Sequence, residues 1–170
     1  MQSFLTNTQS FELTAKHLDN KRLHKQTLEA WQCLLTMCEL DPDGNDRKPK
    51  GWSNHPVVKM WRGHETLLVS YISATYFEWL DRGYKSTLLE KTYRTYDFAV
   101  QLGRISPELT FPSWMLDGEY FANLCSTHRT ALLVKNYDWY RQFNWPEDPG
   151  HAPETYEYLW PHQDGYAAVA

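Results

Sequence analysis

A cluster of polar side chains in residues 17–29 (HLDNKRLHKQTLE) has the residue types that acid–base chemistry needs. On a helix, Arg22, Gln26 and Glu29 would share one stripe, because they are separated by four and three residues. Lys25 borders this stripe. One carboxylate beside two cations and an amide is a candidate catalytic or base-reading surface. The alternative, which spacing alone favours, is a solvated helix face with a Lys25–Glu29 ion pair.

A second candidate is the tripeptide Asn54-His55-Pro56, placed where a helix is expected to begin. Its Asn and His side chains would lie beside free backbone N–H groups, an arrangement suited to a phosphate. The alternative is plain capping of the helix by Asn54, and spacing alone favours this alternative.

The third candidate is the pair His128-Arg129, which could contact a phosphate backbone. Capping by Ser126, with Arg129 packed on an aromatic ring, explains the same residues equally well. The sequence is also rich in tryptophan, which is mainly expected in the core. One or two of these indoles would be enough to stack on a flipped base, and the candidates are Trp31, Trp52, Trp61, Trp79 and Trp114.

Helical periodicity and stop signals indicate the elements that must position these side chains. We predict two early helices, one over 11–17 and one from Asp19 or Asn20 to about Glu39. A helix of about 25 residues should begin at Pro56 and end at Arg82-Gly83. Two further helices are predicted over 86–103 and 117–135. Residues 41–51 are predicted to form a loop, and the prolines after Asn144 predict a tail that wraps over the surface. The predicted fold class is therefore all-α: a single-domain (1–170) irregular helical bundle with a long central helix and a Pro-rich C-terminal tail.

The net charge of −4 is unusual for a protein that binds nucleic acid. Residues 138–170 hold six acidic side chains and one basic one, so the first 137 residues carry 16 bases and 15 acids. A DNA-binding face is therefore expected in the first 137 residues.

Composition suggests a soluble, cytoplasmic monomer that needs no cofactor. The three cysteines (Cys33, Cys38 and Cys125) form no CxxC pair, and an odd number argues against a disulfide framework. The first residues lack the pattern of a signal peptide, and no apolar run approaches the roughly 18 residues that would span a membrane. No metal-binding or nucleotide-binding motif occurs.

The order of four motifs resembles the pyrimidine-dimer DNA glycosylase family of phage and bacterial endonuclease V type. These motifs are His17-Leu18-Asp19, Glu29, Gly51-Trp52-Ser53-Asn54-His55-Pro56 and Arg82-Gly83-Tyr84. The resemblance covers the N-terminal half well and the second half weakly. It implies an all-α DNA repair enzyme of a bacterial cell or phage-infected host that acts on damaged or modified duplex DNA.

The resemblance also implies the roles of individual residues. The family uses its N-terminal α-amino group as nucleophile and a glutamate on an early helix as acid/base, which maps onto Glu29. Because the bulk of Gln2 should disfavour removal of the initiator methionine, the nucleophile is expected to be the amine of Met1. Arg22 and Lys25 would then be basic residues of the same helix that contact DNA. With the candidates named above, the residues expected to bind DNA are Arg22, Lys25, Gln26, Asn54, His55, His128 and Arg129.

Two other functions are compatible with the same residues. One is an enzyme of the same fold that acts on modified bases or nucleosides, which the near-neutral surface favours. The other is a non-catalytic helical binding module, in which Glu29 and His55 would be structural.

Overall fold

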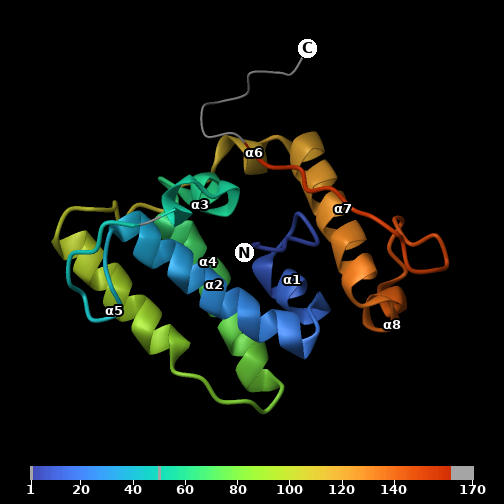
Figure 1. The fold of residues 1–170 in the computed structure, drawn as a ribbon, viewed down its shortest axis with the longest axis horizontal. Coiled ribbons are helices and arrows are strands. Elements are labelled where there is room, and N and C mark those ends of the chain that lie inside the picture. Colours follow the sequence, from blue (N-terminus) through green and yellow to red (C-terminus); the bar gives the residue numbers. More distant parts are fainter. Residues whose placement is uncertain (1, 50, 162–170) are drawn as a thin grey trace.

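The computed structural model describes residues 2–49 and 51–161, and over these residues the chain is helical with no β-strand (Figure 1). The predicted all-α fold is confirmed. The α-helices are α1 (Phe11–His17), α2 (Asn20–Cys38), α3 (Pro56–Trp61), α4 (Glu65–Asp81), α5 (Leu88–Gln101), α6 (Ser113–Leu116), α7 (Gly118–Lys135) and α8 (Tyr137–Tyr140). Two single 3-10 turns, Trp52–Asn54 and Arg141–Phe143, accompany them. No helix of the described residues combines the length and the apolar character that crossing a bilayer requires.

The first two helices begin where their capping residues predict. The hydroxyl of Ser10 accepts from the Leu13 N–H at the start of α1, and the carboxylate of Asp19 accepts from the Arg22 N–H at the start of α2. These caps satisfy backbone donors that have no partner inside a helix. The two predicted helices, 11–17 and 19/20 to about 39, are therefore confirmed.

The predicted continuous helix from Pro56 to Arg82 is wrong. The chain leaves the helix after Trp61 and starts again at Glu65, because Gly63 adopts a left-handed conformation with φ of +83°. The Glu65 side chain accepts from the Gly63 N–H at 2.9 Å and so fixes the turn. Helix α4 remains the central helix, packed against α1, α2 and α5. Its predicted end is confirmed, since Gly83 has φ of +85°.

The apolar core has two parts. Residues 2–6, which we call the N-terminal segment, lie between them (Figure 1). One part joins α2, α4 and α5, where the Thr27 hydroxyl donates to the Thr75 hydroxyl at 3.0 Å. The other joins α7 and α8 to Phe4, Leu18 and Leu23. Residues 2–6 are all buried, and they link the two parts because Leu5 belongs to the first and Phe4 to the second.

The predicted helix 117–135 is confirmed as α7, and the described tail runs back along it as expected (Figure 1). The Leu159 N–H donates to the Thr127 hydroxyl at 3.3 Å, and the Tyr120 hydroxyl donates to the Trp160 carbonyl at 3.2 Å. No helix interrupts residues 144–161, as their prolines predicted.

We predict that Gly63→Ala lowers the free energy of unfolding by roughly 1–2 kcal/mol, because an L-residue is strained in the left-handed region. Gly118→Ala is the matched control, since Gly118 opens α7 without a positive φ and an added Cβ meets nothing within 4 Å. Urea denaturation of both variants measures the difference. Equal stability of the two variants would contradict the account of the α3–α4 break.

Candidate active site

The N-terminal segment places its backbone against the carboxylate of Glu29. The Gln2 N–H donates to Glu29 Oε2 at 3.3 Å, and Lys25 Nζ lies 3.5 Å from Oε1 of the same carboxylate. The Glu29 side chain is 14% exposed, whereas the Lys25 side chain is 61% exposed. Glu29 therefore lies at the boundary between core and surface, where one edge remains open to a substrate.

Side chains of α2, α3 and α4 fix the rest of this segment. The Phe4 N–H donates to Gln26 Oε1 at 2.8 Å, and the Tyr71 hydroxyl donates to the same oxygen at 2.7 Å. The Trp61 indole donates to the Ser3 hydroxyl at 3.0 Å. A buried backbone N–H without a partner costs about 1–3 kcal/mol, so these bonds hold the segment in one place.

His128 anchors the segment from α7. Its Nδ1 accepts from the Leu5 N–H at 3.0 Å, and burial lowers the pKa of His128 to about 3. The ring is therefore neutral with its proton on Nε2, which lies 2.8 Å from the side-chain amide of Gln2. Because Nε2 must donate, the amide oxygen of Gln2, which has no other partner, is its acceptor once the amide is oriented accordingly.

Two of the residues expected to bind DNA lie in the core instead. Gln26 is 2% exposed and His128 is 0% exposed, so neither offers a surface to a phosphate or a base. This burial disfavours the predicted DNA contacts of Gln26 and His128. Both side chains serve as partners for the buried backbone of the N-terminal segment.

The two arginines of the predicted set are engaged within the fold. Arg129 donates to both carboxylate oxygens of Glu147, at 2.7 and 2.6 Å, and to the Thr6 carbonyl at 2.8 Å. Arg22 pairs with Asp19 and donates to the Lys135 carbonyl at 3.0 Å. Their charges are compensated by internal acceptors, and we expect them to hold the fold together.

His55, rather than Asn54, caps α3, because its Nδ1 accepts from the Val57 N–H at 3.2 Å. Burial lowers the pKa of His55, and the nearby Glu29 carboxylate opposes this shift. Glu29 and His55 therefore lie within electrostatic reach of each other. Asn54 is exposed beside them.

Two aromatic residues of the tail approach this region and were not predicted from the sequence. The Trp160 ring meets His55 edge-on with centroids 6.0 Å apart, and the Tyr158 ring meets His128 in the same way at 5.6 Å. The signal was the alternation Tyr156-Glu157-Tyr158-Leu159-Trp160, since alternate residues of an extended chain share a face.

A family model described as pyrimidine dimer DNA glycosylase matches residues 1–92. The chain belongs to this family. The matched part includes Glu29, Lys25 and His55, whereas α7 and the tail lie outside it. No curated protein and no solved structure matches the chain. Membership implies a DNA glycosylase whose substrate is DNA. Met1, the expected nucleophile, lies outside the described residues.

The neutral state of buried His128 makes stability depend on pH. Below the unfolded-state pKa of 6.5 the unfolded chain binds a proton that native His128 does not accept, so stability falls with pH from 6.5 towards 3. We expect the wild type to lose about 1.4 kcal/mol per pH unit more than His128→Asn, whose amide oxygen can still accept from Leu5. Urea denaturation between neutral and acidic pH measures this difference. Parallel curves would contradict a neutral His128.

Proposed function

We propose that the protein is a DNA glycosylase with coupled AP-lyase activity on damaged pyrimidines, in which the amine of Met1 is the nucleophile and Glu29 is the acid/base. The observation that carries this proposal is the 3.3 Å hydrogen bond from the Gln2 N–H to Glu29 Oε2. The α-amino nitrogen is three covalent bonds from the Gln2 nitrogen, so the amine can reach the carboxylate.

An α-amino group suits the first step because its pKa is about 7.7–8.0, well below that of a lysine, so a substantial fraction is neutral near pH 7. The neutral amine attacks C1′ of the sugar, and the glycosidic bond breaks as the base leaves with the bonding electrons. The sugar ring then opens, with its ring oxygen accepting a proton, and an iminium links the amine to C1′.

Glu29 suits both proton transfers of this sequence. In its protonated form it can donate to the departing ring oxygen, and as a carboxylate it can remove the C2′ proton that the iminium makes acidic. Loss of that proton expels the 3′ phosphate and breaks the strand. The same carboxylate would stabilise the cationic iminium.

The positive charge that faces DNA would come mainly from Lys25. This side chain is 61% exposed and lies at the mouth of the Glu29 site, whereas Arg22 and Arg129 are paired inside the fold. A phosphate next to Lys25 would place the sugar near Glu29.

The internal pairing of Arg22 and Arg129 favours a second candidate, an enzyme with the same site that acts on modified bases or nucleosides. Such substrates need less phosphate attraction than intact duplex DNA. Mass spectrometry of nucleosides released from modified DNA distinguishes this candidate from the first.

Borohydride trapping on duplex DNA that is ultraviolet-damaged or abasic tests the proposed chemistry. We expect a covalent adduct with the wild type, and a strand-cleavage rate lower by roughly 10²- to 10⁴-fold in Glu29→Gln, because the acid/base is removed. Glu119→Gln is the control, since Glu119 is an exposed glutamate in the first turn of α7. Absence of an adduct with every such substrate would rule out the lyase mechanism.

Lys25→Gln is expected to weaken DNA binding about equally for damaged and undamaged duplexes. Loss of one phosphate contact should reduce the slope of log affinity against log salt by about 1. Lys91→Gln, on the exposed side of α5, is the matched control. An unchanged salt slope in Lys25→Gln would remove Lys25 from the DNA interface.

A further inference from the structure

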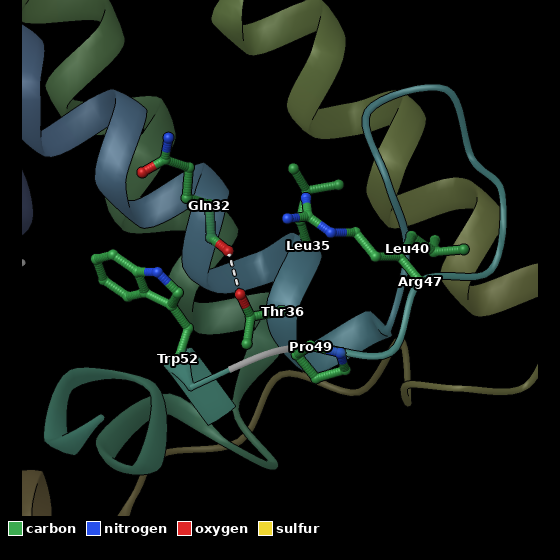
Figure 2. A pocket seen from close by; sticks show the side chains of 7 residues that line it. All are labelled: Gln32, Leu35, Thr36, Leu40, Arg47, Pro49 and Trp52. Carbon is green, nitrogen blue, oxygen red and sulfur yellow. Dashed lines mark hydrogen bonds between the residues drawn. The ribbon is translucent and has the colours of Figure 1, made fainter. Parts of the chain in front are cut away.

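A groove of about 650 Å³ runs along α4, and the neighbouring helices α1 and α5 lie on either side of α4 (Figure 1). Side chains of all three helices line it, and we call it the α4 groove. It differs from the smaller pocket of about 170 Å³ in Figure 2, which is lined by Gln32 and adjoins the candidate active site, because Gln32 follows Glu29 by one helical turn.

The α4 groove lies on the face of α4 that points away from the N-terminal segment. Ser70, Ser73 and Phe77 share this face, because they are separated by three and four residues. Tyr71 and Thr75 lie on the opposite face, where both form hydrogen bonds with α2. A partner in the groove would therefore leave the candidate active site open.

The interior of the groove offers apolar contact more than hydrogen bonds. The hydroxyls of Ser70 and Ser73 donate to carbonyls of their own helix, at 3.3 and 2.9 Å, so neither has a donor left for a phosphate. Phe77 is 52% exposed and Tyr93 is 45% exposed, and both side chains line the groove. Exposed aromatic rings beside short side chains form a surface on which apolar side chains can pack.

Acidic side chains dominate the charge of the groove. The exposed Glu12 and Asp81 line it, and Lys16 is the one cation among the described residues that do so. Glu78 also lines the groove, but it is paired with Arg82 at 2.8 Å. This charge repels the phosphates of DNA.

Two more carboxylates lie along the α5 side. Glu90 and Asp97 are exposed and lie three residues before and four residues after Tyr93, so they share a face of α5 with this ring. The apolar strip is therefore bordered by acids on α1, α4 and α5. Complementarity of charge selects a partner that carries lysine and arginine around an apolar stripe.

The shape of the groove fits a helix. It follows α4 from Thr66 to Asp81, a distance of about 22 Å at 1.5 Å per residue. The described residues contain no strand, so an extended peptide would find no sheet edge with which to pair its backbone. A helix satisfies its own backbone and can lay an apolar stripe of about four turns into the groove.

We propose that the α4 groove binds a basic amphipathic helix of a partner protein. The apolar stripe of that helix packs on Phe77 and Tyr93, and its lysines and arginines face the carboxylates of α1, α4 and α5. The proposal goes beyond the action on DNA, because it assigns a protein-binding role to the side of α4 that faces away from Glu29.

Two synthetic peptides of about 16 residues test the proposal. The basic probe has leucines along one helical stripe and lysines elsewhere, and the acidic probe has glutamates in place of the lysines. We expect the basic probe to bind about tenfold more tightly or better, and to shift the backbone NMR signals of groove residues on α4 and α5. Equal binding of the two probes, shifts confined to the region of Glu29 or the tail, or no binding at about 1 mM would overturn the proposal.

Variants of the groove provide the second measurement. Ser70→Arg puts a long cation into the groove and should weaken binding of the basic probe on the order of tenfold, whereas Ala122→Arg, at an exposed site of α7, should not. Asp81→Asn and Glu90→Gln should each weaken it by about two- to fivefold, with Glu119→Gln as the control. Wild-type affinity of Ser70→Arg for the basic probe would contradict the proposal.

A second copy of the chain is the competing occupant of the groove. Sedimentation equilibrium of the protein alone distinguishes the two, and we expect a monomer. A dimer that Ser70→Arg dissociates would assign the groove to self-association and overturn the proposal. None of these measurements uses DNA, so their outcome is independent of the proposed lyase chemistry.

Discussion

The structure depends on one buried, extended segment whose backbone N–H and C=O groups need hydrogen-bond partners. Residues 2–6 cross the centre of the molecule without a neighbouring strand, so side chains must satisfy their N–H and C=O groups. Four helices supply these partners, and they are Thr14 on α1, Gln26 and Glu29 on α2, Tyr71 on α4, and His128 and Arg129 on α7. Buried polar side chains of α1, α2 and α7, among them Thr14, Gln26 and His128, are therefore partners of one peptide segment, and these helices meet around it.

The proposed mechanism uses an amine of the main chain rather than an amine of a side chain. A lysine nucleophile must lose the freedom of a long side chain, whereas an α-amine has no side chain of its own to order. The Gln2 N–H donates to the Glu29 carboxylate, which lies between the buried segment and the exposed Lys25. The buried segment, the exposed Lys25 and the proposed proton transfers thus all involve one carboxylate.

Local signals in the sequence were sufficient for the helix starts at Ser10 and Asp19 and for the end at Gly83, because each depends on residues only a few positions apart. Helical periodicity does not predict the break at Gly63, because His64 and its neighbours continue the helical spacing across it. Sequence spacing places Gln26 on one stripe with Arg22 and Glu29, and His128 next to Arg129, which favours a surface position for both. Their burial follows from contacts with residues 2–5, which helical periodicity cannot show. The candidate role of Glu29 follows from its helical spacing and from the order of motifs. The approach of Tyr158 and Trp160 does not follow from either, because it depends on the path of the tail across the fold.

The most direct test of the central claim is to locate the DNA adduct after borohydride trapping by mass spectrometry of tryptic peptides. We expect the adduct on the α-amine of the peptide that covers residues 1–16, which ends at Lys16. An adduct on the side chain of Lys25, the exposed amine beside Glu29, would contradict it.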